Sequence, residues 1–198
     1  NSALDFVRAA EGRNGPIPRD VDPAYVWGEA LEALEAFGPS VRIVNLETAI
    51  TTAPEPAPKP VTYRMHPGNV GILAAFGADC CALANNHVLD WGVQGLRETL
   101  DALDAAPVRR AGAGVDLEDA WRAVGLPRPD GGHVVVVSVA DATSGVPAGW
   151  AARENAPGVA FLDGRIGARV ARVARAVTAV RADGDIVVAS IHWGSNWG

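Results

Sequence analysis

Apolar residues follow two patterns along this chain: short continuous runs, and longer stretches in which they recur every three or four positions. The runs are typical of buried strands, and the recurring spacing is typical of amphipathic helices. Strands are therefore expected at 41–45, 79–84, 108–111, 133–139 and 185–191, with a shorter extended piece at 61–65. Helices are expected at 22–38, 69–76, 91–105, 116–121 and 166–180, the last with an apolar stripe from Ile166 to Val180.

Strand and helix alternate in this pattern, which predicts a mostly parallel sheet covered on both faces. No internal repeat or interdomain linker interrupts the alternation, so we expect one α/β domain over residues 1–198. The stretch TTAPEPAPKP at 51–60 holds four prolines in ten residues and is expected to be an extended excursion on the surface.

Composition narrows the class of protein. The 198 residues are 48% apolar, enough for a globular core, and no apolar run approaches the roughly 20 residues of a membrane span. A net charge of −6 argues against non-specific nucleic-acid binding. The two cysteines, Cys80 and Cys81, are adjacent in a predicted strand, so their side chains should point to opposite faces and stay unbonded.

Polar side chains follow three of the predicted buried strands directly. Glu47 follows the first, Asn86 and His87 follow the second, and His192 ends the last. Because the carboxyl ends of parallel strands share one sheet edge, we expect these groups to converge there. Oxygen and imidazole donors without thiolates suit Mn, Fe, Zn or Mg. Taken singly, each residue has an ordinary alternative as a turn or surface group.

Four segments together resemble the capsule-synthesis CapA family, which includes the poly-γ-glutamate capsule proteins. They are NLETAIT (45–51), ALANNHVLDWG (82–92), GLRETLDALDAAPVRRAGAG (95–114) and SIHWGSNWG (190–198), in the family's order. That family is similar to the calcineurin-like metallophosphatases. The resemblance implies a metallophosphatase-like layered sheet, a sandwich flanked by helices, with two divalent metal ions held at strand ends.

The resemblance also implies roles for the strand-end residues. Glu47 corresponds to a metal-bridging carboxylate, and Asn86 and His192 correspond to metal ligands. His87 corresponds to a catalytic histidine near the substrate, which can donate a proton. Asp90 either fixes the tautomer of His87 as part of the catalytic set or caps the helix that follows; the sequence leaves both open.

Further residues are expected at the substrate. Asn45 and Asn85 lie beside the ligand positions, Arg64 can meet an anionic group, and Trp193 can stack on substrate, although solvent exposure or packing would also account for the last two. The family's opening Gly-Asp element is expected before residue 1 and its closing His-x-His element after residue 198. The domain is therefore expected to be truncated at both ends.

Two functions from different classes compete. The first is a metal-dependent enzyme acting on a phosphoester or an anionic polymer in cell-envelope synthesis, with other capsule-synthesis proteins as partners. The second is a non-catalytic assembly or polymer-handling module of capsule export with a vestigial metal site. A cell-envelope location would require a signal or anchor upstream of residue 1.

Overall fold

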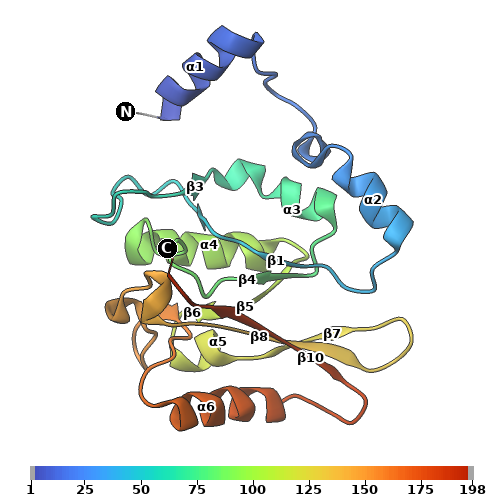
Figure 1. The fold of residues 1–198 in the computed structure, drawn as a ribbon, viewed down its shortest axis with the longest axis vertical. Helices are drawn as coiled ribbons and strands as arrows, with labels where there is room; N and C mark the ends of the chain where they lie inside the picture. The colour runs from blue at the N-terminus through green and yellow to red at the C-terminus, as the bar shows by residue number, and fades with distance from the viewer. Residues whose placement is uncertain (1–2, 196–198) are drawn as a thin grey trace.

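Two three-stranded sheets form the centre of the fold, and helices pack around them (Figure 1). This computed structural model describes residues 3–195. The first sheet is all parallel and consists, in spatial order, of β1 (Ile43–Asn45), β4 (Cys80–Ala82) and β5 (Arg109–Ala111). The second consists of β10 (Ile186–His192), β8 (His133–Ala140) and β7 (Val124–Pro127), with β10 parallel and β7 antiparallel to β8.

Two short ladders complete the strands. β2 (Ala49–Ile50) pairs in parallel with β3 (Arg64–Met65), and β6 (Ala113–Gly114) pairs antiparallel with β9 (Gly158–Val159). The predicted α/β class is confirmed, but two three-stranded sheets replace the single, mostly parallel sheet. The prediction missed this division, and the antiparallel strand β7, because the apolar runs carry no signal for which strands pair with one another.

Helices occupy most of the predicted stretches. The confirmed α-helices are α3 (Gly71–Phe76), α4 (Gly92–Ala105), α5 (Leu117–Trp121) and α6 (Ile166–Thr178), and α1 (Ala3–Asn14) is additional. The predicted helix at 22–38 is instead a 3-10 helix, Pro23–Trp27, followed after Gly28 by α2 (Ala30–Phe37). Further 3-10 helices are Pro67–Asn69, Ala142–Ser144 and Ala148–Trp150. Among the helices of residues 3–195, none is long and apolar enough to cross a membrane.

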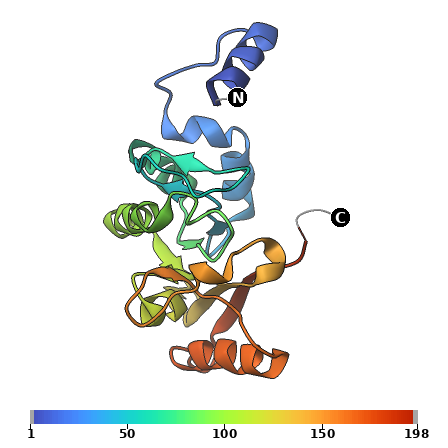
Figure 2. The same ribbon diagram turned by 90° about the vertical axis from the view of Figure 1, so that its left-hand side faces the viewer.

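The N-terminal helices stand apart from the sheets, as two perpendicular views show (Figure 2). Trp27 joins this part to the rest of the fold. Its indole nitrogen donates to the carbonyl of Ile72 at 2.8 Å, and its ring lies 4.3 Å from the ring of Phe76. One aromatic side chain therefore supplies a long-range contact between these helices and α3.

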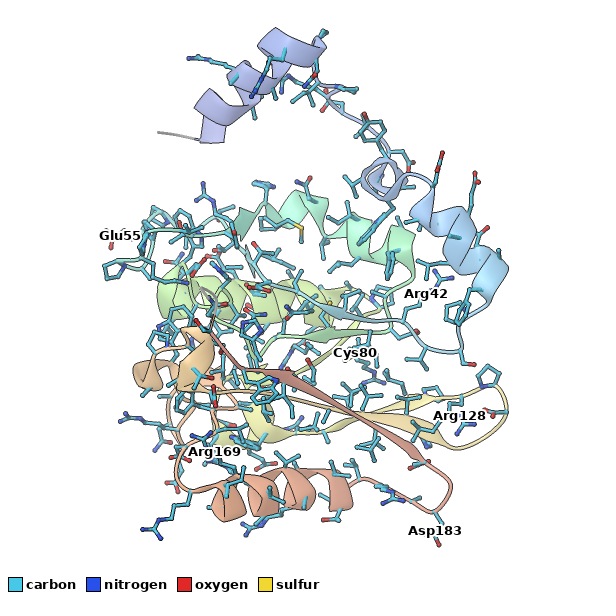
Figure 3. All side chains as sticks on the ribbon, viewed as in Figure 1. Arg42, Glu55, Cys80, Arg128, Arg169 and Asp183 are labelled. Atoms are coloured by element: carbon cyan, nitrogen blue, oxygen red, sulfur yellow. The ribbon has the colours of Figure 1, made fainter. Side chains whose placement is uncertain are left out.

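Cys80 and Cys81 confirm that β4 is buried on both faces. Cys80 packs among Ala111 and Val136, residues of the two sheets, and lies in the middle of the molecule (Figure 3). Cys81 packs on the opposite side, in the cluster that includes Leu96 and Leu100 of α4. Both thiols are free, and burial raises the pKa of each to about 12. They are therefore small core residues.

The last strand is more exposed than its sequence predicts. β10 is at the edge of its sheet, and Ile186, Val187 and Ile191 are exposed. On α6, Val177 packs against β8 while the other end of the apolar stripe, Ile166 and Val170, is exposed. An apolar run thus predicted the strand correctly but not its burial, because burial depends on which neighbours cover it.

Gly112 lies where the two sheets meet. It connects β5 to β6 with a φ of +96°, a conformation that favours glycine. A Cβ atom there would lie 2.5 Å from the hydroxyl of Ser138 in β8 and 2.9 Å from the Cβ of Ala84. The same Ser138 hydroxyl accepts a hydrogen bond from the amide of Ala84 at 3.2 Å. Close approach at Gly112 therefore holds β8 against the loop that follows β4.

The start of the proline-rich segment is tied to α4 by Glu98. Residues 51–60 contain no helix or strand, as predicted. The Glu98 carboxylate accepts hydrogen bonds from the Thr51 hydroxyl at 2.6 Å, the backbone amide of Thr52 at 2.9 Å and the side-chain Nε2 of Gln94 at 2.8 Å. These bonds, that of Thr51 first, lower the pKa of Glu98 from 4.5 to about 2.

Glu98→Gln should lower the free energy of unfolding by about 1 kcal/mol at pH 7, because the carboxylate accepts charge-assisted hydrogen bonds. Since the folded-state pKa is lowered, this stabilisation is complete above about pH 4.5 and is lost as the pH falls toward 2. Urea unfolding of both proteins at several pH values measures it. Glu35→Gln, at an exposed position of α2, is the control. A difference that is constant from pH 7 to pH 2 would contradict the assignment.

Gly112→Ala should destabilise the fold by about 2–4 kcal/mol, since the added methyl group meets Ser138 and Ala84 and the backbone angle disfavours alanine. Gly167→Ala is the matched control, because this glycine lies in α6 with nothing within 4 Å of its added methyl group. There the change should stabilise by up to about 1 kcal/mol. Equal effects of the two substitutions in chemical unfolding would show that Gly112 does not hold the sheets together.

Candidate functional site

The polar residues that follow the strands meet in one cluster. β1 ends at Asn45, the loop after β4 carries Asn85, Asn86 and His87, and β10 ends at His192. Hydrogen bonds link the three strand ends. Asn85 joins the first two, and the Nε2 of His192 lies 3.0 Å from the Oδ1 of Asn86, across 106 positions of sequence. The structure thus brings together groups that the sequence placed at one sheet edge.

Asn85 is the internal support of the cluster. It is fully buried, and its Nδ2 donates to the side-chain oxygen of Asn45 at 3.1 Å and to the carbonyl of Leu46 at 2.9 Å. Its Oδ1 accepts from the amides of His87 and Val88, both at 3.0 Å. Both polar atoms of its side chain are thus bonded within the protein. Asn85 therefore orders the loop, and its contact with substrate stays a prediction.

Glu47 and His87 face each other at the surface of the cluster. The Nδ2 of Asn45 donates to one carboxylate oxygen of Glu47 at 2.8 Å, and the other oxygen lies 4.0 Å from the Nε2 of His87. The Glu47 side chain is 39% exposed, whereas that of His87 is 10% exposed. Asn45 thus holds one carboxylate oxygen of Glu47 by a hydrogen bond, and the Glu47 side chain stays partly exposed to solvent.

Asp90 holds the other nitrogen of His87. Its Oδ2 lies 2.6 Å from the Nδ1 of His87 and accepts from the backbone amide of Tyr63 at 2.7 Å. Because the carboxylate is the acceptor, Nδ1 carries the hydrogen of this bond, and Nε2 faces the cluster. The helix-cap alternative is wrong, since the residue before α4 is Trp91 and its side chain makes no capping bond.

His192 is fixed through its backbone as well as its ring. Its carbonyl accepts from the amide of Asp141 at 3.2 Å and from the hydroxyl of Ser144 at 2.9 Å. Asp141 in turn pairs with Arg169 of α6 at 3.0 Å, and bonds from Thr143 and Arg169 outweigh burial to lower the pKa of this carboxyl. The end of β10 is therefore held in place although the strand is exposed.

Two residues of the cluster were missed by the sequence analysis. Lys59 donates from Nζ to Asp90 Oδ1 at 2.5 Å and to the carbonyl of Asn86. The ring of Tyr63 lies 4.2 Å from that of His87, tilted by 33°. Lys59 lies in the proline-rich segment and Tyr63 follows it, and neither stands at the end of a predicted buried strand. The only available signal was that Lys59 is the single lysine of the chain.

Two further predicted substrate residues, Arg64 and Trp193, lie at the surface. The guanidinium of Arg64 stacks over the ring of Trp91 at 4.1 Å and donates to the carbonyl of Ala53 at 3.0 Å. It lines a pocket of about 480 Å³ together with Thr51, Thr52, His66 and Asn69. Trp193, the residue after His192, is 74% exposed. Substrate contact by Arg64 and Trp193 stays a prediction.

Three groups of the cluster carry donor atoms of the kinds that bind divalent cations, and two of them, Asn86 and His192, are bonded to each other. Glu47 offers a carboxylate, and Asn86 and His192 offer an amide oxygen and an imidazole nitrogen, donors that suit hard or borderline metals. The second carboxylate, Asp90, is already bonded to Lys59 and His87. Within residues 3–195, no three His, Cys, Asp or Glu side chains form a metal-binding group.

Comparison with known proteins gives a consistent family. Residues 5–198 match the family model described as bacterial capsule synthesis protein PGA_cap. Over 198 residues the chain is 48% identical to a probable polyglutamine synthesis accessory protein of Mycobacterium tuberculosis, covering 99% of this chain and 52% of that protein. It is 28% identical over 141 residues to the PGA biosynthesis protein CapA of Bacillus subtilis, covering 71% of this chain and 35% of that relative. The chain thus spans about half the length of the first relative.

Asn85→Ala should lower the free energy of unfolding by about 3 kcal/mol, because it leaves buried amides and carbonyls without partners. The exposed Asn155→Ala should change it by less than about 0.5 kcal/mol and serves as the control. Chemical unfolding measures both. If the two variants are equally stable, Asn85 does not support the loop.

Proposed function

The chain belongs to the bacterial capsule synthesis protein PGA_cap family, and on that premise we propose that its strand-end cluster is a metal-dependent, phosphoesterase-like site. We place the site in the synthesis of an anionic capsule polymer, in line with the names of the relatives. The observation that carries the proposal is His87, whose Nδ1 is fixed by Asp90 while its Nε2 faces Glu47. A histidine held in this way is suited to proton transfer.

Glu47, Asn86 and His192 would hold the cation. Bound there, a divalent ion would supply Lewis-acid polarisation of a phosphoryl oxygen and a water of lowered pKa. The partly exposed carboxylate of Glu47 also supports the proposal. By itself it would repel an anionic substrate, and a cation bound beside it would offset that repulsion. The two-cation form of the site, in a metallophosphatase-like sandwich, is the finer version of the proposal and needs ligands beyond this cluster.

His87 would act on the proton of the leaving or attacking group. Nε2 is the atom that faces the open side of the cluster, so a proton would pass there while Asp90 keeps Nδ1 bonded. The tilted ring of Tyr63 restricts the rotation of the imidazole from one side. Arg64 and Trp193 would bind distal parts of the substrate, and the pocket beside Arg64 suits a carboxylate or phosphate group.

The second candidate is a polymer-handling or assembly module without catalysis, working with other capsule-synthesis proteins. Relatives named as accessory or capsule biosynthesis proteins favour this reading as much as an enzyme. The two functions differ in whether removal of a metal ligand and removal of His87 have separate effects.

In the full-length protein, His192→Ala should weaken Mn²⁺ or Zn²⁺ binding by at least about 10-fold, because it deletes a ligand. His87→Ala should keep the metal and slow hydrolysis of a chromogenic phosphodiester by about 10²–10⁴-fold. Metal content and rate are measured on the same preparations, by elemental analysis and absorbance. His133→Ala, at a half-exposed histidine on β8, is the control.

The outcomes separate the alternatives. Loss of metal from His87→Ala with full content in His192→Ala would reverse the two roles. No metal bound by any of the proteins, with no rate above that of buffer, would leave the polymer-handling module as the function.

A further inference from the structure

Lys59 lies in the interior of the candidate site. It is the only lysine among the 17 basic residues of the chain, and its side chain is 19% exposed. The ammonium donates to Asp90 Oδ1 at 2.5 Å and to the carbonyl of Asn86, and it lies 5.1 Å from the ring centre of Trp150. Two segments distant in sequence, the loop after β4 and the 3-10 helix Ala148–Trp150, therefore contact one charged group.

Asp90 is the group through which Lys59 reaches His87. The carboxylate is fully buried, and its two oxygens have separate partners. Oδ1 receives the Lys59 ammonium, while Oδ2 receives the Tyr63 amide and contacts the Nδ1 of His87. A buried carboxylate needs such partners, and losing one oxygen's donor frees the group to rotate.

The proline-rich segment presents Lys59 in a fixed position. Its beginning is bound by Glu98, and near its end the amide of Ala57 donates to the backbone carbonyl of Asp90 at 2.6 Å. Prolines fix the backbone angle φ and reduce the freedom of the stretch between these anchors. Glu55, between the two anchors, lies at the outer edge of the molecule (Figure 3). Residues 51–60 thus form a strap that ends at the site.

We propose that Lys59 is a positioning residue, which acts through Asp90 to keep His87 in the Nδ1–H tautomer with Nε2 turned toward Glu47. Proton transfer at Nε2 rests on the proposed function, whereas the tautomer of the His87 ring does not. Without the ammonium, the Asp90 carboxylate loses the contact that orients Oδ2, and the preference for one tautomer should weaken.

The test is NMR of the histidine ring nitrogens in the metal-free protein at about pH 8, where an ordinary histidine is neutral. Lys59→Met removes the ammonium and keeps an unbranched side chain that is one atom shorter. We expect the ratio of the Nδ1–H to the Nε2–H form of His87 to fall by about tenfold, the effect of one charge-assisted hydrogen bond. His66 and His133 provide unaffected internal references. If Lys59→Met does not fold, Lys59→Gln replaces it, with a smaller change in the same direction.

Chemical rescue separates positioning from a general structural effect. In Lys59→Cys, the thiolate displaces bromide from 2-bromoethylamine and forms a thioether that carries an ammonium at the length of lysine. Cys80 and Cys81 are buried, with pKa values raised to about 12, so they should not react. Aminoethylation should restore the single tautomer, whereas capping with methyl methanethiosulfonate, which adds no charge, should not.

A His87 ring state that is unchanged in the folded Lys59→Met or Lys59→Gln variant overturns the proposal. So does rescue by the uncharged cap. Because neither metal nor substrate is present, these results are independent of the metal-binding and hydrolysis measurements that test the proposed function.

Discussion

The candidate site depends on one buried carboxylate. Asp90 has no exposed surface, and an ionised group in that position is stable only because His87, Lys59 and the amide of Tyr63 surround it. These partners come from two stretches of the chain, the loop after β4 and residues 59–63, so the same interaction orients the histidine, anchors the proline-rich strap and closes the loop after β4. Removing any partner would leave a buried polar group unpaired, which costs more than the bond itself contributes.

The two sheets supply the frame for this interaction. Parallel pairing of β1 with β4 places Asn45 beside the loop that carries Asn85 to His87, and parallel pairing of β10 with β8 brings His192 to the same region. At Gly112 the two sheets are in close contact. The residues of the cluster therefore come from both sheets, and their geometry depends on the position of one sheet relative to the other.

Within the cluster, buried groups hold exposed ones. Asn85 and Asp90 have their polar atoms occupied inside the protein, whereas Glu47 retains an open oxygen. Fixed internal groups of this kind preorganise a site, since a ligand does not have to order them. That division supports a binding or catalytic role for Glu47 and His87, and a supporting role for Asn85.

The sequence by itself determined the α/β class, most strands and helices, the opposed cysteines and the meeting of Glu47, Asn86, His87 and His192, because apolar runs and strand ends are local signals. Only the tertiary structure decided that Asp90 orients His87 instead of capping α4, that Lys59 enters the site, and that β10 is exposed. The reason is that these contacts join residues far apart in the sequence. Lys59 and Asp90 are 31 positions apart, with a proline-rich segment beside them whose path has no periodicity to read. Burial likewise depends on which elements cover a strand, and that is a property of the folded chain.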